Sequence, residues 1–324
     1  MHKDLPTYDE LLSRQDAPPG SSWGLWGQGD VLGCLNLIDR AATARGVASV
    51  LSHDVFALNL AMEQPDPPLF SRPRMTHEVT WLDGEAGHDD ALLNWNTQSS
   101  SQWDGFRHIR HPVHGFYNGV ADDDHGMHHW AQRGIATRAV LCDVGRFLAS
   151  RGESIAYDTA QWIEPSVILD TLEEQGSQVA PGDVLLIRTG WLEWYLEQNE
   201  DVRRDLAERT RAPGLAPGAP TARILWDLHV AAVAADNPAV EAYPSSAHFS
   251  GDQIRALVSA GRFEEFFVHF ALLPLLGLPL GEFFALGDFA AACAQDRRYE
   301  ALLTSAPLNL QSGVASPPNA IVMR

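Results

Sequence analysis

The sequence predicts an α/β fold, a single domain built around a mixed β-sheet. Short β-rich runs, each bounded by turn-forming residues, alternate with stretches whose apolar residues recur at helical spacing. Strands interleaved with helices in this way are typical of α/β proteins. We expect strands at residues 55–60, 77–82, 139–144, 183–188 and 230–235.

The expected helices lie between and after these strands. Residues 162–175 carry apolar side chains on one side of a helix, and residues 202–211 and 250–260 are two further helices. Ser250 is placed to cap the last of these, because a serine oxygen can accept hydrogen bonds from the first turn. Residues 316–324, SPPNAIVMR, read as a loop followed by a closing strand.

The charge and cysteine content exclude several classes of protein. The 324 residues carry 23 Lys and Arg against 42 Asp and Glu, a net charge of −19, so neither nucleic acid nor an anionic membrane surface is expected as a partner. The three cysteines are too few and too dispersed for a disulfide framework or a CxxC metal pair. No signal peptide or membrane-spanning run is evident, and we expect a cytoplasmic protein.

The segment QSSSQWDGFRH, residues 98–108, is the most unusual part of the chain. It places two amides, a carboxylate and an imidazole within eleven residues, and these groups can form a metal or general acid–base site. They can equally form a polar loop whose Gln and Asp side chains cap neighbouring backbone. Composition alone does not separate the two interpretations.

Three other segments contain candidate site residues. His269 and Glu282 bracket an otherwise apolar run, where a lone histidine is more often a core residue than a ligand and a buried glutamate needs a partner. Residues 234–241, AADNPAVE, lie at the end of an expected strand, where they form either part of a ligand crevice or an ordinary turn. Trp23 and Trp26 can line a ligand pocket or pack over the hydrophobic core.

Common catalytic signatures are missing from the sequence. No GxGxxG follows an expected strand, and Walker A, GxSxG and HExxH sequences do not occur. These observations argue against nucleotide-dependent enzymes, serine hydrolases of the common type and zincins.

Several separated motifs, in order, resemble the cyclase-like metal-dependent hydrolase family, which includes bacterial kynurenine formamidases and isatin hydrolases. The resemblance spans most of the chain. Its motifs are WGLWGQGDVLGCLNLI, QSSSQWDGFRH, PGDVLLIRTGW, AAVAADNPAVE, HFALLPLLGLPLGE and APLNLQSGVASPPNAI. The resemblance implies a swivelling β/β/α-type domain over residues 23–324, preceded by an N-terminal arm at residues 1–22. It also implies a homodimer or homotetramer, in which Trp23 or Trp26 would complete a partner's pocket.

The resemblance also implies a set of site residues. When the family signature HxGTHxDxPxH is aligned with residues 98–108, its two leading histidines fall on Gln98 and Gln102. Its aspartate falls on Asp104 and its last histidine on His108. Later His and Glu ligands of the family fall on His269 and Glu282. The implied divalent-metal ligands are Gln98, Gln102, Asp104, His269 and Glu282, and His108 is implied as the proton carrier.

The two glutamines are a large departure from the family signature. An amide oxygen is a hard, neutral and weak donor, so Mn²⁺, Mg²⁺ or Ca²⁺ becomes plausible beside Zn²⁺. Alternatively, Gln98 and Gln102 bind substrate and a reduced site of Asp104, His269 and Glu282 holds the ion. Loss of the metal is a third interpretation.

The resulting expectation is a metal-dependent hydrolase of a small amide, cyclic amide or lactone, acting on carbon–nitrogen bonds other than peptide bonds, similar to an arylformamidase. Two alternatives stay open: a metal-dependent lyase or cyclase, and a metal-free small-molecule binding protein on the same fold. The substrate is expected to be apolar or aromatic, contacted by Trp23, Trp26, Trp103 and Phe106.

Overall fold

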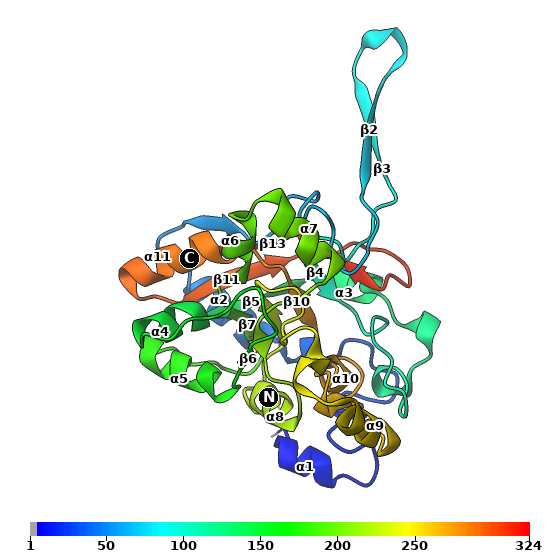
Figure 1. Ribbon diagram of the computed structural model, residues 1–324, viewed down its shortest axis with the longest axis vertical. Helices are drawn as coiled ribbons and strands as arrows, with labels where there is room; N and C mark the ends of the chain where they lie inside the picture. The colour runs from blue at the N-terminus through cyan, green and yellow to red at the C-terminus, as the bar shows by residue number, and fades with distance from the viewer. Residues whose placement is uncertain (1–4) are drawn as a thin grey trace.

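The computed structural model describes residues 5–324 and has a nine-stranded mixed sheet at its centre (Figure 1). The strand order is β1-β13-β11-β5-β7-β9-β10-β4-β12. The bounds are β1 Val55–Ala57, β4 Gln102–Asp104, β5 Ile135–Cys142, β7 Val184–Ile187, β9 Ala232–Ala235, β10 Leu280–Glu282, β11 Glu300–Ser305, β12 Ala315–Ser316 and β13 Ala320–Met323. The α/β fold around a mixed sheet is therefore confirmed.

The centre of the sheet is parallel and its margins are antiparallel. Strands β5, β7, β9 and β10 run parallel in that order, and every residue of β7 and β9 is buried. Continuous apolar runs are typical of strands covered on both faces, as we expected for 139–144 and 184–187. At the far side, β10 pairs antiparallel with β4, and this junction positions the candidate site.

Helices cover the sheet (Figure 1). Their bounds are α1 Tyr8–Ser13, α2 Arg40–Ala48, α3 Met127–Arg133, α4 Val144–Ser150, α5 Ser166–Gln175, α6 Trp191–Leu196, α7 Glu200–Glu208, α8 Ala219–Asp227, α9 Gly251–Ser259, α10 His269–Leu272 and α11 Gly287–Asp296. Among the described residues, none of the helices has the length and hydropathy to cross a membrane.

Local sequence sets where these helices begin. Helix α5 starts later than the predicted residue 162, because Pro165 disfavours helical backbone at the residue before it. The preceding Trp162–Ile163 instead forms β6, which pairs with β8, Gly214–Leu215. The predicted cap of α9 is confirmed, since the Ser250 side chain accepts a hydrogen bond from the Gln253 backbone in a capping box.

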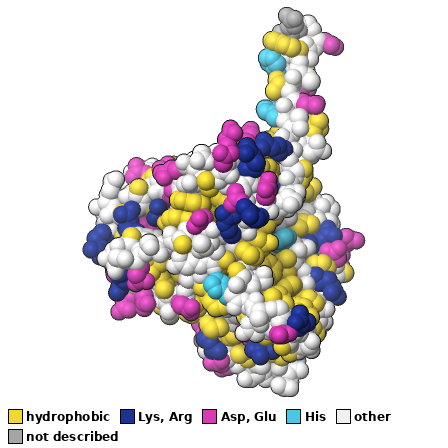
Figure 2. All heavy atoms as spheres, viewed as in Figure 1, with side chains coloured by type: hydrophobic (Ala, Val, Ile, Leu, Met, Phe, Trp, Pro, Cys, Tyr) yellow, Lys and Arg dark blue, Asp and Glu magenta, His cyan; other side chains and the backbone are white. Residues whose placement is uncertain are grey.

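The strand predicted at residues 77–82 lies outside the main sheet. Strand β2, Thr76–Trp81, pairs only with β3, His88–Leu93, and the hairpin projects far from the body (Figure 1). All residues of both strands are exposed, and Figure 2 shows hydrophobic side chains along the hairpin. An alternating run indicates a strand but not which sheet it joins.

The N-terminal segment packs on its own chain. Helix α1 contacts α8, and the Tyr8 backbone donates a hydrogen bond to Asp227 of that helix. Tyr8 and Leu11 are buried in the main hydrophobic core. The described part of the predicted arm is thus held against the domain.

Candidate metal centre

The candidate site lies where β4 and β10 run side by side. Their register places Glu282 opposite Gln102 and Leu280 opposite Asp104. Because side chains alternate along a strand, Gln102 and Asp104 share one face and Trp103 takes the other. Gly281, opposite Trp103, permits this close approach, since a Cβ there would lie 2.9 Å from Trp103 Cζ3.

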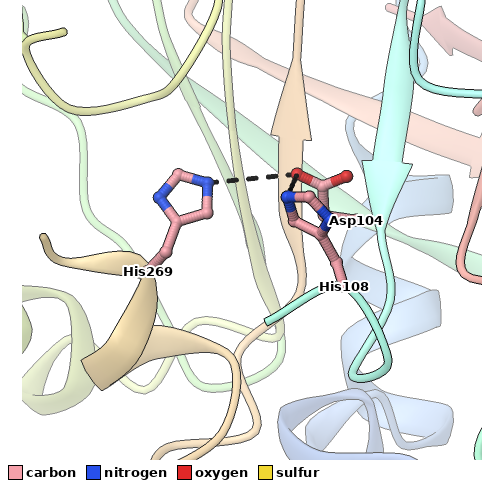
Figure 3. A group of neighbouring side chains, drawn as sticks. All are labelled: Asp104, His108 and His269. Carbon is pink, nitrogen blue, oxygen red and sulfur yellow. Dashed lines mark ion pairs between the residues drawn. The ribbon is translucent and has the colours of Figure 1, made fainter. Parts of the chain in front are cut away.

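Asp104 is the centre of the cluster and is fully buried. Its Oδ1 accepts hydrogen bonds from the Gln98 and Gln102 amides at 2.9 and 3.3 Å. Its Oδ2 has no hydrogen-bond partner within residues 5–324 and lies 3.8 Å from His108 Nε2 and 3.9 Å from His269 Nε2. Figure 3 shows both imidazoles reaching toward this carboxylate. Ligand atoms of the three residues lie within 4.8 Å of one another.

His269 begins α10 and is buried between two acids. Its Nδ1 lies 2.6 Å from Glu241 Oε1, and its Nε2 lies 3.2 Å from Glu282 Oε1. Burial lowers the pKa of the imidazole, but the hydrogen bonds to Glu241 and Glu282 outweigh burial and raise it to about 10. Without a metal ion, the protonated imidazole therefore supplies the positive charge.

Glu282 completes a concentration of buried negative charge. Its Oε2 accepts a 2.6 Å hydrogen bond from the same Gln102 nitrogen that bonds Asp104. Burial, followed by the charge of Asp104, raises the pKa of this carboxyl to about 7. Buried carboxylates this close together require a cation or a proton.

His108 lies at the solvent side of the cluster. Its side chain is 24% exposed, whereas those of Asp104, His269 and Glu282 are at most 4% exposed. The Gln98 amide nitrogen lies 3.0 Å from His108 Nδ1 and fixes the ring beside Asp104. Burial lowers the pKa of His108, which keeps the imidazole neutral near pH 7 despite the opposing effect of Asp104.

The donor set fits a divalent cation. Asp104 Oδ2 and Gln102 Oε1 are buried acceptors that no donor satisfies in the described part of the chain. The cluster as a whole offers two carboxylates and two imidazoles, a mixture of oxygen and nitrogen ligands suited to Mn²⁺ or Zn²⁺. As arranged here, the amide nitrogens of Gln98 and Gln102 face the carboxylates, so both glutamines orient the acidic groups.

Two members of the predicted aromatic wall are buried away from the cluster. Trp103 is fully buried, and its indole donates to Ser305 on the face away from the cluster. Phe106 is buried against Tyr117 and Trp130. Both are core residues, and the alternation of strand β4 would have assigned Trp103 correctly.

The other two predicted aromatic contacts pack on this chain's own body. Trp23 donates its indole hydrogen to the carbonyl of Pro274, and Trp26 lies edge-on to Trp226. The structure brings neither indole into the Asp104 cluster.

Sequence reasoning missed three neighbours of the cluster. Phe267 stacks on the His269 ring, with centroids 4.6 Å apart and planes 3° apart. Arg72 donates to the carbonyl of Gln98 and lies over the Phe70 ring. Glu241 belongs to the segment AADNPAVE, which the sequence predicted as a ligand crevice or a turn without indicating its contact with His269. Adjacency to His269 would have flagged Phe267, whereas no local signal marks Arg72.

Comparison with known proteins agrees with the fold. A family model described as putative cyclase matches residues 50–242. The crystal structure of a novel cyclase is 26% identical, covers 94% of this chain and 99% of its own, and superposes with a TM-score of 0.79. No curated protein sequence matches significantly.

Two further solved structures show the same fold at lower identity. Isatin hydrolase A from Labrenzia aggregata, bound to benzyl benzoate, is 16% identical over 86% of this chain and 96% of its own, with a TM-score of 0.56. Isatin hydrolase A from Ralstonia solanacearum is 14% identical over 87% and 95%, with a TM-score of 0.57.

Proposed function

The chain belongs to the putative cyclase family, and on that premise we propose a divalent-metal-dependent hydrolase of a small amide, cyclic amide or lactone. The bond cleaved is a carbon–nitrogen bond other than a peptide bond, or an ester in the lactone case. The observation that carries the proposal is the buried Asp104 Oδ2, which has no donor within residues 5–324 and faces two imidazoles. The isatin hydrolases of the same fold favour a hydrolase over a binding protein.

Asp104, His269 and Glu282 would hold the ion, because they supply the most buried donors of the cluster. We propose Mn²⁺ or Zn²⁺, with Mg²⁺ or Ca²⁺ as harder alternatives suited to the oxygen-rich donors. When bound, such an ion supplies a Lewis acid that activates water and polarises a substrate carbonyl.

The remaining polar side chains move or hold protons. His108 takes a proton from the attacking water and returns it to the leaving nitrogen or oxygen. Gln98 orients the His108 ring through its 3.0 Å contact. Gln102 bridges Asp104 and Glu282 and fixes the spacing of the two carboxylates.

Turnover in H₂¹⁸O tests the reaction class, using isatin and N-formylanilines as probe substrates. Hydrolysis must place one solvent oxygen in the carboxyl product. A product formed by loss of water, without solvent oxygen, would overturn the hydrolase in favour of a lyase or cyclase. Purified protein that binds probe but no metal would favour the binding protein.

The substrate is proposed to be apolar or aromatic, on the support of Phe267 stacked on His269. Truncation by Phe267→Ala is expected to raise KM by about 2- to 10-fold with little change in kcat, since an aromatic contact contributes about 0.5–1.5 kcal/mol. Steady-state kinetics check this. Phe266→Ala is the control, because that ring shares the contact with Phe270 and packs on Phe263 where Phe267 stacks on His269. Equal KM increases in both variants would contradict the assignment.

We also propose the homodimer or homotetramer, on the support of the β2–β3 hairpin. Val79, Trp81 and Leu92 lie on one face of the hairpin and are 57%, 62% and 41% exposed. An isolated two-stranded hairpin is marginally stable in water, so this ribbon needs a surface to cover it. Acidic residues flank the apolar ones, while the pocket of the body lined by Arg74, Arg203 and Arg204 also contains Asp66 and Glu200, which pair with Arg74 and Arg204. A second copy carries the same exposed apolar face, so two hairpins can cover each other.

The double change Val79→Ser and Trp81→Ser is expected to convert the oligomer to monomer, measured by light scattering after size exclusion. Thr80→Ala, on the opposite face, is the control and should assemble normally. Wild-type protein that is monomeric, or a double variant that assembles like the wild type, would contradict the proposed interface.

A cytoplasmic location remains part of the proposal. It is supported by the three cysteines, which are free and buried, as expected where thiols stay reduced.

A further inference from the structure

We propose that Glu241 is a positioning residue that orients His269 and strengthens it as a metal donor. This inference rests on the proposed metal-dependent function. Glu241 is fully buried and follows β9 in the chain, 28 residues before the histidine that it contacts. It is not among the residues that the sequence motifs point to as ligands.

Both carboxylate oxygens of Glu241 are committed to the start of α10. Oε1 lies 2.6 Å from His269 Nδ1, and Oε2 accepts a 2.5 Å hydrogen bond from the Val268 backbone. The His269 backbone N–H also donates to Oε1, at 3.4 Å. One carboxylate therefore fixes both the backbone and the ring of the histidine.

The main chain of Glu241 is itself held rigidly. Leu215 of β8 donates to the carbonyl of Val240 and accepts from the N–H of Ala242, on either side of Glu241. Gly214 makes this approach possible, because a Cβ there would lie 2.3 Å from the Glu241 carbonyl carbon. The carboxylate is thus preorganised before any ion arrives.

The contact decides which ring nitrogen is available to an ion. An ionised carboxylate only accepts hydrogen bonds, so His269 Nδ1 carries the hydrogen that Glu241 receives. Nε2 then faces Glu282 Oε1 and Asp104 Oδ2, which is the direction in which a ligand lone pair is needed. A carboxylate behind an imidazole ligand also raises its donor strength, and losing such a partner typically costs about 10- to 100-fold in metal affinity.

The test is Mn²⁺ binding to chelator-stripped full-length protein, measured by calorimetry for the wild type and Glu241→Gln. The variant keeps the shape and one acceptor oxygen but loses the charge, so its Kd for Mn²⁺ should rise by about 10- to 100-fold. Raising the Mn²⁺ concentration should restore kcat, which a damaged fold would not allow. Glu241→Asp, which keeps the charge on a shorter side chain, should give an intermediate Kd and serves if the glutamine variant does not fold.

Asp183→Asn is the matched control. Asp183 is an equally buried carboxylate, bonded to Arg138 and the Ala180 backbone at the opposite end of the parallel strands. An unchanged Kd in Glu241→Gln, or an equal rise in Asp183→Asn, would overturn the positioning role. Wild-type protein that binds neither Mn²⁺ nor Zn²⁺ would instead overturn the proposed function, so the two failures are distinguishable.

Discussion

The His108→Ala variant is expected to lose about 10²- to 10⁴-fold in kcat while keeping its metal ion, because removal of a general acid–base group costs about that much. The His108 side chain is more exposed than those of Asp104, His269 and Glu282, so it can exchange protons with solvent. Its ring is held beside Asp104 by Gln98 rather than by a second buried acid. Kinetics and metal analysis of the same preparation check the prediction.

The comparison variant is His129→Ala, whose ring bonds the Asp124 carbonyl outside the cluster. It should keep full activity. If His108→Ala loses its metal together with its activity, His108 is a ligand, as its place beside Asp104 and His269 permits. Retention of full activity would remove His108 from the mechanism altogether.

The Asp104→Asn variant is expected to lose metal binding by more than about 100-fold, since even partners behind metal ligands contribute up to that factor. Activity should fall with it. Yet the metal-free variant should be no less stable than the metal-free wild type. Asp104 and Glu282 share the Gln102 amide nitrogen, and neutralising one buried carboxylate relieves the repulsion between them.

Thermal unfolding with and without Mn²⁺ separates these effects. Ion at about 100 times its Kd should stabilise the wild type by about 2.7 kcal/mol and the variant by almost nothing. Equal stabilisation of both proteins by Mn²⁺ would show that the ion binds elsewhere. A large loss of stability in the metal-free variant would contradict the account of the buried charges.

The sequence predicted three strands of the parallel centre, β5, β7 and β9, because their apolar runs match burial on both faces, whereas β10 was not predicted. The alternating run at residues 77–82 correctly predicted a strand, but alternation does not encode the partner strand, and this one pairs outside the main sheet. The first turn of α5 was misplaced because Pro165 outweighs a helical spacing of apolar residues.

The candidate site was only partly accessible to sequence reasoning. Asp104 and His108 are close in the chain, so local spacing and the family resemblance both singled them out. His269 and Glu282 came from the resemblance, and only the β4–β10 pairing brings Glu282 beside Gln102. The segment of Glu241 was a candidate, but its contact with His269 could not be predicted, because that contact depends on how β8 pairs with the Glu241 loop.

The most direct test of the central claim is metal dependence of the wild-type protein. Purified chain should contain about one divalent ion per molecule, lose turnover of a small amide or lactone when a chelator removes it, and regain turnover with Mn²⁺ or Zn²⁺. Protein that binds no divalent ion, and whose turnover and thermal stability do not respond to added Mn²⁺ or Zn²⁺, would contradict the account.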